Sequence, residues 1–404
     1  MIVLYIRKIM KTIYTIIFLA LVLLATKEIF QTKNNFVYQK NLVPTPIPAV
    51  NHPNNNVQAL ALADINTSQN IKVIHLDTPK SFKAFYVTYY SFESSNKLNQ
   101  IILSAQRNEV NSLIIDIHSN NNGLFDFSDN KIKSILSQLH DKGFYLVARI
   151  VSFKINENEP NSPWYDPASK DRWNQIADVS KKAIDLGFDE INYDYIRYGG
   201  PDESQSKTPI EQREPIIKSF FEFLNKEVRQ KYGRPISADI FGTTFVDPEK
   251  GIGQDPKDAF ENFDYIMPMT YPSHWAIDSL GIRNPGNHPY QIVYQSLEKG
   301  LSRIKNDPLK IANFRCWVQA FDIESISPWK LRVYTAQDIQ DQIKACDDAG
   351  GVGWSLWNGF SNYKDFAGVL PSPDSIPPII PTSTMSIKAT STIKNITTTE
   401  KISH

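Results

Sequence analysis

Residues 187–198 read Gly-Phe-Asp-Glu-Ile-Asn-Tyr-Asp-Tyr-Ile-Arg-Tyr, and this stretch decides the fold class. Apolar and polar side chains alternate along residues 190–195, which is the period of a β-strand with two different faces. One face carries apolar and aromatic side chains, and the other carries Asn192 and Asp194. A helix-like pattern ends just before Gly187, where a left-handed residue would stop it. We therefore predict a strand that follows a helix and has Asp194 at its carboxyl end.

Working outward, the same alternation of short and long segments recurs on both sides of this strand. Seven further short apolar runs predict strands, at residues 84–89, 113–117, 145–151, 236–241, 265–270, 314–319 and 353–357. Longer stretches with helical spacing lie between them, for example at residues 97–106, 131–140, 171–186 and 214–232. Thr335 and Asp338 form a predicted capping box in front of one more helix.

Eight strands that alternate with helices indicate an α/β protein with a parallel sheet. We predict a single-domain (β/α)8 TIM barrel rather than an open doubly wound sheet, because eight such units in one domain favour closure. The first predicted strand is not followed by the glycine-rich G-x-G-x-x-G loop of dinucleotide-binding proteins. The sequence predicts no cofactor.

The segments outside the barrel differ from it in composition. We expect a barrel over residues 71–370, a linker rich in Asn, Pro and Gln over 31–70, and a disordered Pro/Ser/Thr-rich tail over 371–404. Residues 1–30 hold a basic stretch followed by an apolar run at 13–25. This pattern predicts either a cleaved signal peptide or an uncleaved membrane anchor. Both alternatives place the barrel outside the cytoplasm, as a secreted or membrane-anchored domain.

Charge and cysteine content restrict the function further. The chain has 43 basic and 43 acidic residues, so it lacks the basic excess of a general nucleic-acid binder. Its only cysteines are Cys316 and Cys346, which we predict to be buried free thiols. A zinc-type hydrolase site would need closely spaced ligands, and beyond Asp116 and His118 the sequence has no such pair. We therefore predict no metal.

Polar and aromatic residues gather at the predicted carboxyl ends of the strands, which is where barrel enzymes carry their active sites. On the expected inward face or in the following loops lie Asp116, His118, Arg149, Asp194, Arg197, Asp239, His274, Trp317, Gln319 and Trp357. Two carboxylates on neighbouring strands, Asp194 and Asp239, are what glycoside hydrolysis requires. Arg149 has an alternative role as a buried counter-ion for Asp116 or Asp194.

These blocks resemble the bacterial putative glycoside hydrolase domain family, a TIM barrel distantly similar to the α-amylase superfamily. The resemblance rests on Gly187–Tyr198, on Ser-Ala-Asp-Ile-Phe-Gly at 237–242, and on later blocks at 265–275, 316–321 and 353–358. It implies a hydrolase-type barrel with Asp194 and Asp239 at the catalytic positions. The chain departs from the family pattern after the third strand, where Phe153-Lys154-Ile155 replaces Phe-Lys-Asp.

Two hypotheses follow. In the first, the chain hydrolyses an extracellular or cell-envelope polysaccharide, with Asp194 as nucleophile and Asp239 as general acid/base, as the similarity to the α-amylase order of strands implies. His118, His274 and Gln319 would then bind sugar hydroxyls, and Trp317 and Trp357 would stack on sugar rings. Arg197 would orient the substrate or Asp194. In the second, the same barrel is a surface glycan-binding module without catalytic activity.

Overall fold

The structure is a computed structural model that describes residues 72–117, 125, 127–157, 162–200, 206–322 and 333–363. The predicted N-terminal segment, linker and C-terminal tail therefore lie outside the described residues. Within the described part, no helix is both long and apolar enough to span a bilayer.

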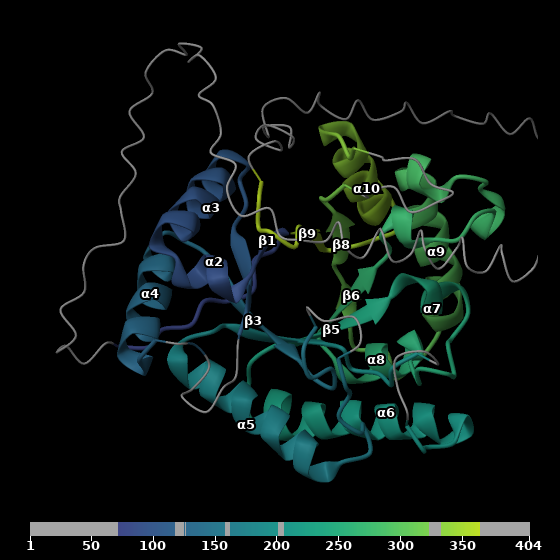
Figure 1. The fold of residues 1–404 in the computed structure, drawn as a ribbon, viewed down its shortest axis with the longest axis horizontal. Helices are drawn as coiled ribbons and strands as arrows, with labels where there is room; N and C mark the ends of the chain where they lie inside the picture. Colours follow the sequence, from purple (N-terminus) through teal and green to yellow (C-terminus); the bar gives the residue numbers. More distant parts are fainter. Residues whose placement is uncertain are drawn as a thin grey trace, which may run out of the picture. The chain divides into compact units, whose positions relative to one another are not determined.

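The described strands form one closed parallel barrel, as predicted (Figure 1). Their order around the barrel is β5-β4-β3-β2-β1-β9-β8-β6-β7, and the pairing of β5 with β6 closes it. The strands are β1 (Phe82–Val87), β2 (Ser112–Asp116), β3 (Tyr145–Val151), β4 (Glu190–Asp194), β5 (Ile236–Phe241), β6 (Tyr265–Met269), β7 (Asn313–Phe314), β8 (Cys316–Gln319) and β9 (Gly353–Trp357). The short β7 and β8 together occupy the place of the predicted strand at 314–319, with Arg315 between them.

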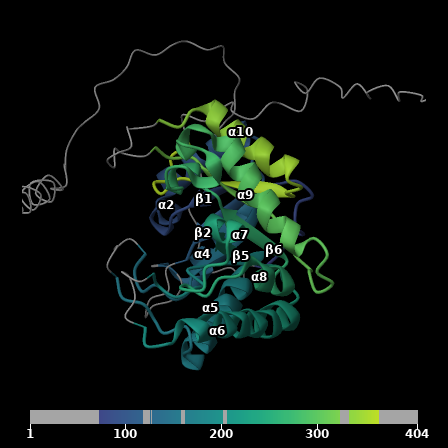
Figure 2. The same cartoon turned by 90° about the vertical axis from the view of Figure 1, so that its right-hand side faces the viewer.

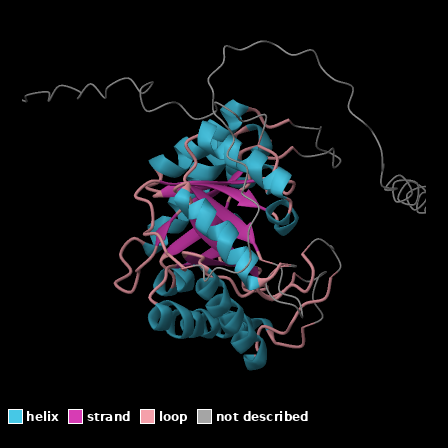
Figure 3. Cartoon of the chain, turned by 90° about the vertical axis from the view of Figure 1, so that its left-hand side faces the viewer, coloured by secondary structure: helices cyan, strands magenta, loops and turns pink. Residues whose placement is uncertain are grey.

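Helices surround the barrel on its outside (Figures 2 and 3). They are α2 (Tyr89–Glu93), α3 (Ser95–Arg107), α4 (Asp129–Asp141), α5 (Lys170–Leu186), α6 (Ile210–Leu224), α7 (Gly242–Val246), α8 (Pro256–Asn262), α9 (Pro289–Ile304) and α10 (Ala336–Asp348). A π-helical segment, η1 (Asn225–Gln230), continues α6, and three short 3-10 turns follow β6 at η2 (Pro272–His274), η3 (Ser279–Gly281) and η4 (Pro285–Asn287).

Local sequence signals set several of these boundaries. Gly187 ends α5 with a φ of +117°, a left-handed conformation that glycine adopts without steric cost. Thr335 and Asp338 form the predicted capping box of α10. The first strand was predicted two residues too late, at 84–89. It ends at Val87 because the Thr88 side chain accepts a hydrogen bond from the Ser91 amide and so caps α2.

Two apolar layers hold the fold together. The larger layer lies between the strands and the outer helices, and the smaller one fills the barrel with inward side chains such as Phe82, Ile114, Val147 and Met267. Buried apolar side chains of this kind each stabilise the fold by about 1.5–3 kcal/mol. Apolar side chains thus fill much of the lower interior, where Glu190 and Arg315 also form a buried ion pair, and further polar side chains gather toward the carboxyl end.

The prediction of free thiols is wrong. Cys316 on β8 and Cys346 on α10 form a disulfide, with their Cα atoms 6.1 Å apart. The two residues are 30 positions apart in the sequence, but α10 packs directly on β8 and brings them together. Two cysteines are too few for a framework of several disulfides, but they can still form one disulfide with each other.

Candidate active site

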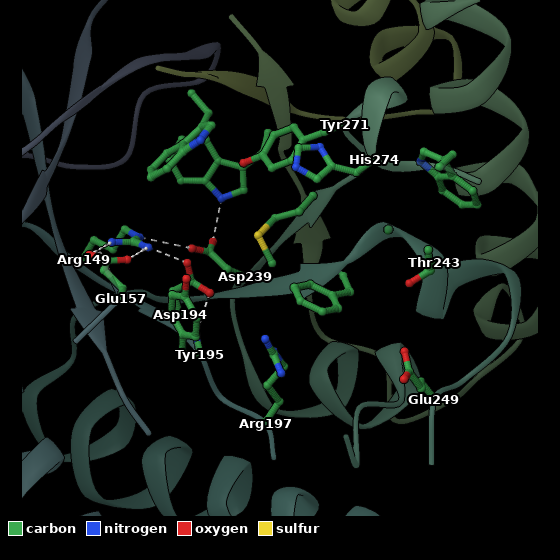
Figure 4. A pocket seen from close by; sticks show the side chains of 16 residues that line it. Arg149, Glu157, Asp194, Tyr195, Arg197, Asp239, Thr243, Glu249, Tyr271 and His274 are labelled. Atoms are coloured by element: carbon green, nitrogen blue, oxygen red, sulfur yellow. Dashed lines mark hydrogen bonds and ion pairs between the residues drawn. The ribbon is translucent and has the colours of Figure 1, made fainter. Parts of the chain in front are cut away.

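Neighbouring strands align the polar side chains that were predicted to face inward. The parallel register pairs Asp116 of β2 with Arg149 of β3, and Arg149 in turn with Asn192 of β4. Asn192 is paired with Ser237 of β5, two residues before Asp239. Because residues at equal height on one face of a barrel converge toward its axis, these side chains meet at one level. Figure 4 shows Arg149, Asp194 and Asp239 pointing toward one another.

Arg149 is the centre of this cluster and is only 2% exposed. Its Nη1 donates to Asp116 Oδ1 at 2.5 Å and to Glu157 Oε1 at 3.1 Å. Its Nη2 donates to Glu157 Oε2 at 2.8 Å and to Asp194 Oδ2 at 2.6 Å. These four contacts use all four N–H groups of the two terminal nitrogens. Arg149 therefore acts as a shared counter-ion for three carboxylates, as one of its two predicted roles proposed.

Asp194 is held at both carboxylate oxygens. Oδ2 accepts from Arg149, and Oδ1 accepts from the backbone N–H of Tyr195 at 2.5 Å. Tyr195 has a φ of +53°, a left-handed conformation that is costly for a residue with a Cβ atom. Such backbone strain concentrates at functional sites. The strained residue here directly follows the candidate nucleophile and turns its own N–H onto that carboxylate.

Asp239 lies in a different environment although it is on the next strand. It is 1% exposed, and its Oδ1 accepts from Asn192 Nδ2 at 2.9 Å and from Trp317 Nε1 at 2.7 Å. Burial raises the pKa of Asp239 well above its usual range, and the charge of Asp194 raises it further. The charge of Arg149 opposes this rise in pKa, but the nearest contact of its guanidinium with Asp239 is long, at 3.8 Å between Nε and Oδ2. The pair thus consists of one carboxylate that is bound by a guanidinium and one buried carboxyl group whose pKa is raised.

The two carboxyl groups line a cavity of about 600 Å³ at the carboxyl end of the barrel. A volume of this size is typical of small-molecule and substrate sites. Its walls are rich in aromatic side chains, which are Tyr195, Phe241, Tyr271, Trp275, Trp317 and Trp357. Arg197 lies between the rings of Trp164 and Phe241, with its guanidinium carbon 4.6 Å from each ring centre. The cavity therefore joins acid–base groups to flat apolar faces.

Residues 155–363 match the model of the family described as "putative glycosyl hydrolase domain". The chain belongs to this family. The match begins after β3 and ends just beyond β9, so it includes Asp194 and Asp239. Curated proteins gave no significant match.

Three solved structures that align with this glycosyl hydrolase domain illustrate the comparison, and one of them reaches a TM-score of 0.50. The C-terminal domain of a putative chitinase from Desulfitobacterium hafniense aligns with a TM-score of 0.50 and 12% identity, over 72% of this chain and 97% of that one. The glycoside hydrolase domain of PgaB from Bordetella bronchiseptica aligns with a TM-score of 0.48 and 12% identity, over 70% and 95%. The spore cortex-lytic enzyme SleL from Bacillus cereus aligns with a TM-score of 0.48 and 12% identity, over 72% and 74%. At such identities the likeness concerns the barrel fold alone.

Most of the sequence-predicted site residues meet in the cavity of the glycosyl hydrolase domain. The cavity wall contains Arg149, Asp194, Arg197, Asp239, His274, Trp317 and Trp357. The imidazole of His274 is desolvated where it packs near Tyr271 and Phe321, which lowers its pKa. His118 lies outside the described residues.

Two predicted residues stand beside the cavity wall rather than in it. Asp116 is on the far side of Arg149 and also accepts a hydrogen bond from the Tyr86 hydroxyl. Burial raises the pKa of Asp116 to about 7, although the Arg149 charge opposes that shift. Gln319 is fully buried, and its side-chain oxygen accepts from both the backbone N–H and the hydroxyl of Ser273. Gln319 thus fixes the loop that carries His274.

The sequence analysis missed nine cavity residues, among them the acids Glu157 and Glu249 and the tyrosines Tyr195 and Tyr271. Glu157 is the most informative because it binds Arg149 with both carboxylate oxygens. It lies two positions after Ile155, the residue that replaces the family's aspartate after the third strand. That replacement was a signal to search the following residues for an acid.

Proposed function

We propose that this domain hydrolyses glycosidic bonds of an extracellular or cell-envelope polysaccharide with retention of configuration. The observation that carries the proposal is the unequal pair of carboxyl groups in one aromatic-lined cavity. Arg149 and the Tyr195 amide donate hydrogen bonds to Asp194, while burial raises the pKa of Asp239 and so favours its protonated form. Glycoside hydrolysis needs this division between a nucleophile or base and an acid.

In the first step, the proton of Asp239 passes to the glycosidic oxygen as the bond to the anomeric carbon breaks. Asp239 Oδ2 is the oxygen suited to carry this proton, because Oδ1 already accepts two hydrogen bonds. Asp194 attacks the anomeric carbon and forms a covalent glycosyl ester. In the second step, Asp239 accepts a proton from water, and the resulting hydroxide displaces Asp194 from the sugar.

The test is release of reducing ends from a panel of polysaccharides, including cell-envelope glycans, by the wild type and by Asp194→Asn. We expect the substitution to lower the rate by several orders of magnitude, because the covalent step loses its nucleophile. Asp185→Asn, an exposed acid on α5, is the matched control and should leave the rate unchanged. Activity that persists in Asp194→Asn would contradict the assignment. Glycan binding without turnover in the wild type would favour the glycan-binding module instead.

The stereochemistry needs a separate measurement. Proton NMR of the first product formed should show the same anomeric configuration as the bond that was cleaved. An inverted product would remove the nucleophile role from Asp194 and make it a general base. The same experiment separates a hydrolase with two catalytic steps from one with a single displacement.

We further propose that the barrel works outside the cytoplasm, exported by residues 1–30. The Cys316–Cys346 disulfide supports this location, since such bonds persist mainly in oxidising compartments. Protease digestion of intact cells should remove the barrel if it is exported. N-terminal sequencing of the recovered chain would distinguish a cleaved signal from a retained anchor, and an undigested chain with reduced cysteines would contradict export.

A further inference from the structure

Two exposed aromatic side chains stand outside the cavity at the same end of the barrel. Phe360 is 87% exposed and Tyr90 is 61% exposed. Phe360 follows β9 and Tyr90 follows β1, which are neighbouring parallel strands. Trp357, the last residue of β9, lines the cavity and precedes Phe360 by three positions. Both rings therefore follow neighbouring strand ends, one of which carries the cavity residue Trp357.

The turn that carries Phe360 is fixed by its own hydrogen bonds. The side-chain oxygen of Asn358 accepts from the backbone N–H groups of Phe360, at 3.0 Å, and Asn362, at 3.2 Å. The Asn358 side-chain amide donates to the Ala320 carbonyl at 2.7 Å, which ties the turn to the strand end of β8. Ser361 has a φ of +50°, so the turn also bears backbone strain. An ordered, strained turn that presents a phenylalanine to water is unlike a single apolar residue scattered on a surface.

The support of Tyr90 is joined to the same turn. The backbone N–H of Thr88 donates to the Ser361 hydroxyl at 2.9 Å, and the Thr88 hydroxyl caps α2, the helix that contains Tyr90. The ring of Tyr90 lies against that of Tyr89, with 3.7 Å between ring centres, and Tyr89 packs on the main core. Both exposed rings are thus held on adjoining, hydrogen-bonded segments.

We propose that Phe360 and Tyr90 form a binding platform for sugar units of the polysaccharide that extend beyond the cavity. The inference rests on the proposed function, because a polysaccharide is the occupant that would reach from the catalytic pair past the rim. Pyranose rings have apolar faces of axial C–H groups, which pack on uncharged aromatic rings. Phe360 follows the cavity residue Trp357 by three positions, so a polymer that extends from a cavity of about 600 Å³ beyond Trp357 would reach these rings.

The test compares long and short substrates. Phe360→Ala and Tyr90→Ala should each raise KM for the polymer about three- to tenfold, the effect of losing one aromatic contact. The kcat, and both constants for a short oligosaccharide that fills only the cavity, should stay unchanged. Phe360→Trp should preserve polymer affinity. Tyr232→Ala is the matched control, since Tyr232 is an aromatic residue, 38% exposed, just before β5 at the opposite end of the barrel.

A binding measurement separates this inference from the proposed catalysis. Polymer affinity of Asp194→Asn, measured by affinity electrophoresis, should fall about three- to tenfold when Phe360→Ala is added. That result would support the platform even if the wild type released no reducing ends. Three results would each overturn it. The affinities for long and short ligands could fall equally, or the polymer affinity of Asp194→Asn could stay unchanged when Tyr90→Ala is added. The third result is a changed oligomeric state of Phe360→Ala.

Discussion

Replacing Arg149 with methionine tests whether one guanidinium holds the acidic cluster together. The change keeps most of the side-chain length and removes the charge. Three carboxylates, those of Asp116, Glu157 and Asp194, lie 2.5–2.8 Å from its terminal nitrogens and would lose their counter-ion. Removing one partner of a buried ion pair costs about 3–5 kcal/mol, so we expect the unfolding free energy to fall by about 4 kcal/mol at about pH 8.

The loss should depend on pH in a defined direction. The pKa of Asp116 is about 7 in the folded protein, above its unfolded value, so ionising Asp116 destabilises the fold as pH rises toward 7. Arg149 lowers this pKa, and without it the pKa would move higher. As pH rises above about 7, the unfolding free energy of the variant should therefore continue to fall, whereas that of the wild type should no longer change through this group. The difference should grow by about 1.4 kcal/mol per pH unit from this one group.

Urea unfolding followed by circular dichroism, at about pH 5, 7 and 8, would measure both effects. Arg229→Met is the control, because Arg229 is 33% exposed in its pair with Asp264 and should lose less than about 1 kcal/mol. A loss for Arg149→Met below about 1 kcal/mol at about pH 8 would refute the counter-ion role. A loss that is larger in acid than in alkali would refute the assignment of the raised pKa to Asp116.

Three further predictions concern the acid and the disulfide. Asp239→Asn should lower kcat by about 10²–10⁴, but less on aryl glycosides whose leaving group needs no proton, as a chromogenic assay would show. Activity should fall as pH rises through the raised pKa of Asp239. Trp317→Phe removes a hydrogen bond that lowers this pKa, so the alkaline limb of the kcat/KM profile should move to higher pH in that variant. Replacing Cys316 and Cys346 together with alanine should lower the unfolding free energy by about 3 kcal/mol in urea titrations, because the bond closes a loop over a separation of 30 residues.

The barrel could be predicted because its signals are local. A strand such as Glu190–Asp194 alternates its own side chains, and glycines such as Gly187 mark helix ends without reference to distant residues. The inward placement of Asn192 and Asp194 followed from that alternation alone, and the hydrogen bonds of both side chains agree with it. The end of β1 was misplaced because Thr88 fits equally well as a strand residue or a helix cap, and only the fold decides between them.

The arrangement around Arg149 could not be predicted to the same depth. Glu157 lies in a loop, where no period fixes the direction of a side chain, and it reaches Arg149 only because that loop turns back over β3. The disulfide depends likewise on the packing of α10 against β8. The sequence placed Gln319 at the site by position, but its amide is used inside the protein to hold Ser273. Proximity to the carboxyl end of a strand is thus a better guide to location than to role.

One guanidinium accounts for the difference between the two candidate catalytic acids. Arg149 directs its terminal nitrogens to Asp116, Glu157 and Asp194, and leaves Asp239 only its Nε at 3.8 Å. Asp239 is then the more deeply buried and the less compensated of the two candidate catalytic carboxyl groups, and its pKa is raised. The proposed division between acid and nucleophile would therefore arise from the burial of Asp239 together with the way the barrel orients a single planar side chain, and it needs no difference in residue type between the two acids.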